Sequence, residues 1–195
     1  MTPKEYYNTL NFVALSKLLN QHPKEKITKL LSTFRCTQNP DLEEFLITPS
    51  KAIQFEQRDI TRTYLYLGTH NNTLYVVAYF TITLRVLYSE GLSKSVVKKL
   101  DGMDRNREVI PSYLIAQLGK SSICEYKIGE FLLLDAINTI KEAHEIVGGR
   151  FIILDAVNIP KVIEFYQSEP NAFILLDKDS KEDNVKMYYP LAKNI

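Results

Sequence analysis

The sequence predicts an α/β fold in which helices flank a mixed, mostly antiparallel sheet. Three observations predict it. The first half of the chain has short amphipathic helical patterns, followed by two long runs rich in Thr, Tyr, Val and Ile that are typical of a strand hairpin. A strand–helix–strand pattern then covers residues 112–156, and a helix with two short strands ends the chain. This order is typical of an α/β sandwich around a mixed sheet.

Composition favours one compact domain. The chain has 195 residues, of which 45% are hydrophobic and 24% charged, and its net charge of +1 gives no global field that would attract a polyanion. Cys36 and Cys124 are far apart in sequence and have no second pair, which is typical of a reduced protein. No run approaches the roughly 18 apolar residues of a membrane span, and the N-terminus lacks the apolar segment of a signal peptide. We therefore expect a soluble, cytoplasmic protein.

The N-terminal third is expected to be mainly helical. Residues 11–34 predict two short amphipathic helices with a break at the segment QHP, and a short strand is expected over residues 34–37. Asn39 and Pro40 are a suitable cap and first turn for the next helix. A further helix is expected over residues 50–59.

The apolar stripe of the first two helices is too small for a separate domain. It consists of Leu18, Leu19, Ile27, Leu30 and Leu31. Such a stripe packs either on the main sheet or on a second copy of the chain, so both a monomer and a homodimer are open. We expect residues 1–32 to form a helical extension packed on a domain that spans residues 33–195.

The middle of the chain predicts a hairpin and a surface excursion. Strands over residues 61–68 and 73–87 are joined by a turn at Asn71–Asn72, because Asn tolerates the positive φ of a tight turn. The polar segment of residues 88–112 then predicts a partly helical excursion. Its cations are Lys94, Lys98, Lys99, Arg105 and Arg107. A solvated surface explains them, and contact with RNA phosphates is the alternative.

The stretch CEYKIGEFLLLDAI, residues 124–137, lies between a predicted strand and a long helix. The helix is indicated by apolar residues at helical spacing: Ile128, Leu132, Ala136, Ile140, Ala143 and Val147. The pair Gly148–Gly149 supplies a left-handed stop. A helix that begins near Ile128 to Glu130 presents free backbone N–H groups, which suit an anion such as a pyrophosphate. Gly129 allows close approach of a ligand.

One other interpretation of this stretch stays open, and two are excluded. Most strand–loop–helix units with one glycine bind nothing, so ordinary core is an alternative. The missing glycines exclude a Walker loop and a dinucleotide fingerprint.

The order of these pieces resembles the GNAT superfamily of acyl-CoA-dependent N-acetyltransferases. The positions that match the family's strand-to-helix signature run from Cys124 to Gly129, and only the last glycine is kept. The segments IGEFLLLDAI, GGRFIILDAVN and VIEFYQSEPNAFIL are similar to the family's helix opening, next strand, and the helix with the strand after it. The first half resembles a bacterial branch that includes toxins acting on aminoacyl-tRNA.

The resemblance implies a GNAT-like sheet with a splayed parallel strand pair that admits the pantetheine of acetyl-CoA. It implies coenzyme contacts at the end of the central strand, in the loop and helix start, and after the next strand: Leu118, Gly119, Lys120, Tyr126, Lys127, Ile128, Gly129, Glu130 and Asn158. It also implies that Tyr166 protonates the leaving thiolate. A half-buried aromatic on an amphipathic helix is the other interpretation of Tyr166.

The implied function is an N-acetyltransferase that moves an acetyl group from acetyl-CoA to a primary amine by direct attack in a ternary complex. A small-molecule or protein amine is preferred as acceptor. The alternatives are a toxin-type GNAT that acetylates aminoacyl-tRNA, with tRNA or an antitoxin as partner, and a non-catalytic CoA-binding member. His22, His70 and His144 are isolated in sequence, so neither a metal site nor a Ser-His-Asp triad is supported. No general base stands out, since Glu43, Glu44 and Glu56 are expected to be solvated helix carboxylates.

Overall fold

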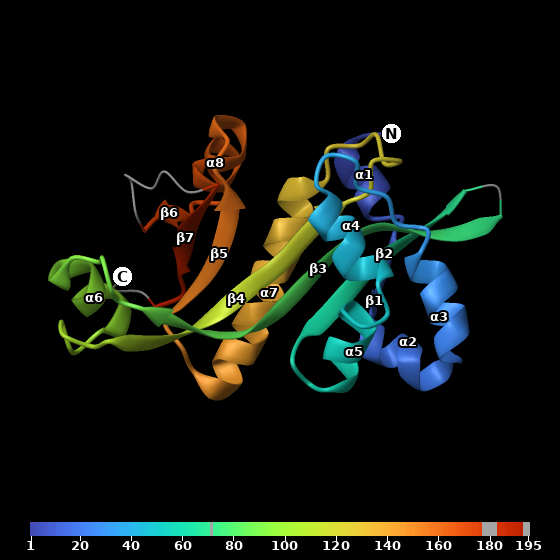
Figure 1. Ribbon diagram of the computed structural model, residues 1–195. Coiled ribbons are helices and arrows are strands. Elements are labelled where there is room, and N and C mark those ends of the chain that lie inside the picture. The colour runs from blue at the N-terminus through green and yellow to red at the C-terminus, as the bar shows by residue number, and fades with distance from the viewer. Residues whose placement is uncertain (71, 177–182, 193–195) are drawn as a thin grey trace. The chain divides into compact units, whose positions relative to one another are not determined.

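The computed structural model describes residues 1–70, 72–176 and 183–192. The strands in this part of the chain are β1 (Asn11–Ala14), β2 (Arg62–His70), β3 (Thr73–Tyr88), β4 (Val109–Lys120), β5 (Phe151–Val157), β6 (Ile174–Leu175) and β7 (Asn184–Pro190). They form one sheet in the order β1-β2-β3-β4-β5-β7-β6 (Figure 1). The helices are α1 (Pro3–Tyr7), α2 (Leu15–Gln21), α3 (Lys24–Leu31), α4 (Pro40–Ile47), α5 (Ala52–Gln57), α6 (Lys94–Asp101), α7 (Gly129–Val147) and α8 (Pro160–Gln167).

The sheet is mixed, as the sequence predicts. β1 pairs with β2, β2 with β3, β5 with β7, and β6 with β7, all antiparallel. β4 and β5 are parallel, with Tyr113 opposite Ile152 and Leu114 opposite Ile153. The strand–helix–strand pattern of residues 112–156 therefore forms the parallel pair, as a crossover through a helix requires.

The chain divides into two compact units, and each is described by itself. Unit 1 comprises Met1–Thr83 and Gln117–Ala136. Its core includes Leu15, Ile27, Leu31, Phe34, Leu46, Ile53, Leu65 and Tyr79. The N-terminal apolar stripe packs into this core in the same chain, with Leu18, Leu19 and Leu30 at its margin. The domain boundary at residue 32 and the number of copies in solution stay predictions.

The N-terminal segment differs from the prediction in two places. Residues 11–14 are a strand, not the start of a helix, because Phe12 and Val13 suit a strand and find the free edge of β2. The strand expected over residues 34–37 is absent. There the Arg35 carbonyl accepts from the Ser122 N–H at 2.7 Å and the Cys36 N–H donates to the Glu43 carboxylate at 2.7 Å, so these groups are bonded to a loop and to a side chain.

The hairpin of β2 and β3 confirms the prediction. Its register runs from Arg62 opposite Ile82 to His70 opposite Thr73, with an irregularity at Tyr66–Leu67. Asn72 has a φ of 59°, the left-handed conformation that a tight turn requires. Asn71 lies outside the described residues.

Unit 2 comprises Leu84–Ala116 and Ile137–Ile195. Its core consists of Leu87, Val97, Leu100, Ile110, Leu114, Phe151, Ile153 and Tyr188. α6 begins where the Ser93 hydroxyl accepts from the Val96 N–H, and it ends at Gly102, whose φ is 91°. Gly148 and Gly149 have φ values of 74° and 122°, so they end α7 as predicted.

Glu56 is a buried carboxylate and not the solvated one that the sequence predicts. Its side chain accepts from the Thr63 N–H at 2.7 Å and lies 3.4 Å from the Arg62 guanidinium. Burial raises the pKa of Glu56, which the Thr63 bond and Arg62 partly offset. The carboxylate thus joins α5 to β2.

We expect Glu56→Ala to lower the free energy of unfolding by about 2 kcal/mol, because it leaves the Thr63 N–H buried without an acceptor. Glu56→Gln keeps an acceptor oxygen and should lose less. Urea unfolding of both variants tests this, and equal losses would show that the acceptor oxygen is not what matters.

Candidate functional site

The loop between β4 and α7 belongs to unit 1 and is anchored in its first half. The Ser121 N–H donates to the Val77 carbonyl at 2.7 Å, and the Cys124 N–H donates to the Ser121 carbonyl at 3.0 Å. The Ser122 hydroxyl accepts from the Thr37 N–H at 2.9 Å. These bonds fix the path of the chain as it leaves the sheet.

The N-terminus of α7 follows directly. The Leu132 N–H donates to the Ile128 carbonyl at 3.1 Å, so the helical ladder begins there. The N–H groups of Gly129, Glu130 and Phe131 consequently have no partner within the helix and carry its positive dipole end. This confirms the predicted start of the helix and gives the geometry that an anion requires.

The side chains of the loop point to different surroundings. The Lys120 ammonium donates to the Cys124 carbonyl and therefore lies against the loop. Lys127 and Glu130 are exposed. The Tyr126 ring stacks on Tyr6 of α1, with centroids 4.2 Å apart and planes at 14°. Tyr126 could therefore offer a ligand its backbone, because its ring is engaged elsewhere.

Gly119 faces the core of unit 1. A Cβ at this position would lie 3.1 Å from the Tyr79 ring and 3.4 Å from both Leu42 and Phe34. Packing alone therefore favours a glycine here, because a Cβ would require the Tyr79 ring to shift by a few tenths of an ångström. The neighbouring Leu118 and Lys120 are half-buried, and whether the backbone of these three residues pairs with a pantetheine stays a prediction.

The Cys124 thiol is 4% exposed and lies 3.7 Å from the Tyr126 carbonyl. The neighbouring Lys120 ammonium donates to the Cys124 carbonyl, and a buried thiol suits an inert cysteine better than an activated nucleophile. The thiol fits a structural role.

Tyr166 lies on α8 in unit 2. Its ring is half-buried, with the Phe165 ring 5.1 Å away and the Phe173 ring 5.7 Å away, both edge-on. Burial raises the pKa of Tyr166 to about 12, so the phenol is protonated at neutral pH. Within the described residues its hydroxyl has no hydrogen-bond partner. The group is therefore in the state that a proton donor must have.

Asn158 follows β5 in unit 2. Its backbone N–H donates to the Asp183 carbonyl at 2.8 Å, and the residue is exposed. Its role in coenzyme binding stays a prediction.

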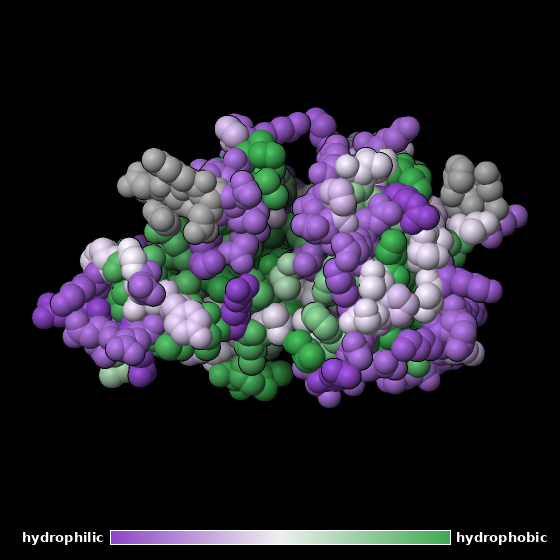
Figure 2. Space-filling model, viewed as in Figure 1, coloured by the Kyte–Doolittle hydropathy of each residue, from purple (hydrophilic) through white to green (hydrophobic). Residues whose placement is uncertain are grey.

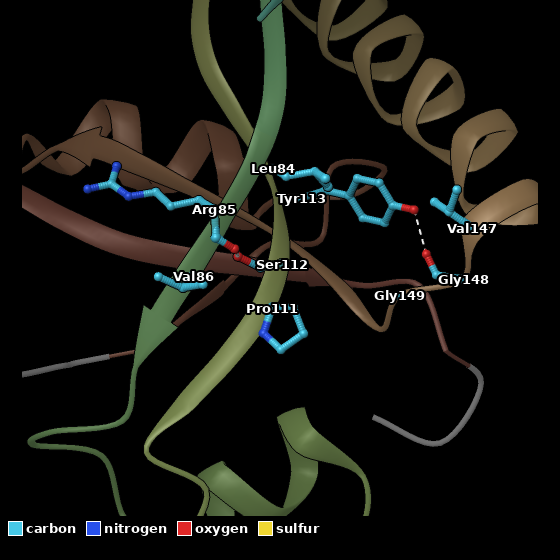
Figure 3. A pocket seen from close by; sticks show the side chains of 9 residues that line it. All are labelled: Leu84, Arg85, Val86, Pro111, Ser112, Tyr113, Val147, Gly148 and Gly149. Carbon is cyan, nitrogen blue, oxygen red and sulfur yellow. Dashed lines mark hydrogen bonds between the residues drawn. The ribbon is translucent and has the colours of Figure 1, made fainter. Parts of the chain in front are cut away.

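Unit 2 also contains a pocket of about 490 Å³ (Figure 3). It is lined by Leu84, Arg85, Val86, Pro111, Ser112, Tyr113, Val147, Gly148 and Gly149. The Tyr113 hydroxyl donates to the Gly148 carbonyl at 2.5 Å. The Arg85 side chain points away from Tyr113 and pairs with Asp155 at 3.4 Å. None of the predicted site residues lines this pocket.

The structure contains a cluster of two tyrosines and an aspartate that the sequence does not predict. The Asp135 carboxylate accepts from the Tyr7 hydroxyl at 2.6 Å and from the Tyr66 hydroxyl at 2.5 Å. Burial, together with the bonds to Asp135, raises the pKa of both phenols. One acidic residue within the apolar run FLLLDAI is the only sequence signal, and nothing in the sequence pairs it with two distant tyrosines.

In the described ranges, no group of three His, Cys, Asp or Glu residues could hold a metal ion. None of the described helices has the length and apolar character needed to cross a membrane.

No family model matches this sequence, and no curated protein matches it either. Solved structures do match the fold. The chain superposes on AtaT complexed with acetyl-methionyl-tRNAfMet with a TM-score of 0.67, at 22% identity, covering 93% of this chain and 94% of that one. A tyrosine-to-phenylalanine mutant of KacT gives a TM-score of 0.67 at 18% identity, with 93% and 94% covered. A mutant of the AtaT toxin gives 0.61 at 26% identity, with 82% of each chain covered. The chain therefore has the GNAT fold of these structures, as the order of its predicted elements and the resemblance of their sequences implied.

Proposed function

We propose that the chain is an acetyltransferase that moves the acetyl group of acetyl-CoA to the α-amine of an aminoacyl-tRNA. The observation that carries this proposal is the opening of α7, where three N–H groups without helical partners follow a loop whose first half is anchored by hydrogen bonds. Structures of the same fold support it, because AtaT has been solved in complex with acetyl-methionyl-tRNAfMet and AtaTR has been solved bound to acetyl-CoA.

In the proposed reaction the N–H groups of Gly129, Glu130 and Phe131 bind the pyrophosphate of the coenzyme. A neutral amine attacks the thioester carbonyl carbon, a C–N bond forms, and the C–S bond breaks. The departing sulfur takes a proton from the Tyr166 hydroxyl, and the proton that the amine loses restores the phenol through solvent. The products are the N-acetylated acceptor and CoA. This route uses neither an acyl-cysteine nor a metal.

The likeness to AtaT and KacT shifts the expected acceptor. Composition favours a small-molecule or protein amine as acceptor, whereas AtaT, which has the same fold, has been solved in complex with acetyl-methionyl-tRNAfMet. An aminoacyl-tRNA also needs cations for its phosphates, and α6 presents Lys94, Lys98 and Lys99 as exposed side chains. Much of the surface over α6 is hydrophilic, at the left of Figure 2.

Incubation of the purified protein with labelled acetyl-CoA and aminoacyl-tRNA should transfer the label to the aminoacyl group. Uncharged tRNA should remain unlabelled, because it lacks the α-amine. Expression of the wild-type chain should arrest bacterial growth, and Tyr166→Phe should relieve the arrest.

Three other outcomes would decide against this function in different ways. Efficient acetylation of free amines or proteins without growth arrest would support the acceptor that composition favours. Binding of acetyl-CoA without transfer to any acceptor would indicate a non-catalytic member. No binding of any CoA ester would overturn the enzyme. If growth is arrested, the neighbouring reading frame should encode an antitoxin that restores growth, as AtaR binds AtaT.

A further inference from the structure

The second half of the loop before α7 is held by side chains and not by the sheet. The bonds of Ser121, Ser122 and Cys124 anchor the first half. From Glu125 to Ile128 the loop is held by side chains: the Tyr126 ring stacks on Tyr6, and the Ile128 side chain is buried. This half leads directly into the free N–H groups of α7.

Tyr6 is itself held in place. Its hydroxyl lies 3.2 Å from the Tyr75 hydroxyl of β3, and the Cys124 thiol is close to the same group. Burial, followed by the bond to Tyr75, raises the pKa of Tyr6, so the phenol is neutral at physiological pH. The ring is therefore fixed both by stacking and by a hydrogen bond to the sheet.

The next residue fixes α1 against the first turns of α7. The Tyr7 hydroxyl donates to the Asp135 carboxylate, and its ring lies 5.4 Å from Phe131 and 4.9 Å from Tyr66. In Figure 1 the blue α1 lies beside the yellow segment that leads into α7. A helix this short is unstable on its own, so these aromatic contacts determine where α1 lies.

We propose that α1 is a positioning element for the coenzyme loop, and that Tyr6 and Tyr7 are positioning residues that act through Tyr126, Phe131 and Asp135. This inference rests on the proposed coenzyme role of the loop. In the predicted domain division α1 belongs to the extension of residues 1–32, outside the acetyltransferase domain. The contacts assign to it the support of the loop that would bind the coenzyme.

The physical reason is preorganisation. A loop that samples several conformations binds its ligand more weakly, in proportion to the fraction of time it spends in the competent one. A stacked aromatic pair contributes about 0.5–1.5 kcal/mol beyond its buried area, which corresponds to a change of about twofold to tenfold in an equilibrium. Loss of the stack should therefore weaken CoA binding without unfolding the chain.

The test is calorimetric titration of the full chain with CoA. Tyr6→Ala should weaken CoA binding by about threefold to tenfold, whereas Tyr6→Phe keeps the ring and should stay within about twofold of wild type. Hydrogen exchange of the amides of residues 125–131 in the free protein should be faster in Tyr6→Ala and unchanged in Tyr6→Phe. Thermal unfolding verifies that both variants are folded.

A double-mutant cycle completes the test. In a Tyr126→Ala background, Tyr6→Ala should have little further effect, because the pair acts as one unit. If wild type binds CoA and Tyr6→Ala binds it equally well, or if Tyr6→Phe is as impaired as Tyr6→Ala, the positioning role is overturned while the proposed function stands. If wild type binds no CoA, the proposed function fails, and this inference fails with it.

Discussion

Tyr166→Phe should lower turnover by about a hundredfold or more while the affinity for acetyl-CoA stays nearly unchanged. General acids contribute roughly 10²–10⁴-fold to rate, and this variant removes only the proton that the leaving sulfur needs. The ring remains, so its edge contacts with Phe165 and Phe173 are kept. Steady-state kinetics and calorimetry measure the two effects separately. Equal loss of turnover and of coenzyme affinity would indicate that Tyr166 serves packing.

The pH dependence adds a second criterion for Tyr166. Turnover should rise as the acceptor's α-amine loses its proton, near the ordinary α-amino pKa of about 8. Because the pKa of Tyr166 is raised to about 12, the phenol remains protonated well above that pH, and the plateau should have no descending limb near pH 10. A descending limb there would show that the acid is another group. Tyr189→Phe, which removes a different half-buried phenol of unit 2, should leave turnover unchanged.

Gly129→Asp should weaken CoA binding by about a hundredfold. A carboxylate beside the pyrophosphate repels it by several kcal/mol at close range in a partly exposed site, and solvent reduces this to roughly the expected value. The same carboxylate lies at the positive end of α7, where it should stabilise the free protein by about 0.3–1 kcal/mol. Weaker binding combined with an unchanged or higher melting temperature would distinguish loss of the anion site from loss of the fold.

Two controls accompany Gly129→Asp. Gly129→Ala adds bulk without charge and should cost less than about tenfold in affinity. Leu134→Asp places the same charge on an exposed face of α7 and should have little effect on CoA binding. If Leu134→Asp is as harmful as Gly129→Asp, the effect is a general one of net charge and not of the helix terminus.

The sequence was most informative where local chemistry decides the structure. The start and stop of α7 follow from helical spacing and two glycines, and the β2–β3 hairpin follows from β-branched residues and Asn72. Elements that depend on a distant partner were missed. Residues 11–14 become a strand because β2 offers an edge, and Glu56 is buried because the Thr63 N–H needs an acceptor. Neither partner is visible in the local pattern.

The candidate site divides in the same way. The helix terminus at Gly129 could be predicted because backbone N–H groups at such a terminus are always without helical partners. The contacts of Tyr6 and Tyr7 could not, since more than 100 residues separate these tyrosines from Tyr126 and Asp135. The acceptor could not be predicted from composition, because net charge is a sum over the whole surface, whereas a tRNA contact would need only a local group of cations.

The packing of Gly119 against Tyr79 links the sizes of two side chains in the chain's evolution. A Cβ at position 119 would come within 3.1 Å of the Tyr79 ring, so the two positions share one volume in the core of unit 1. We expect a larger residue at 119 to occur together with a smaller one at 79, since cores tolerate exchanges that conserve volume better than those that do not. A glycine retained at 119 among relatives would thus indicate an aromatic side chain at position 79, and would not by itself indicate a bound ligand.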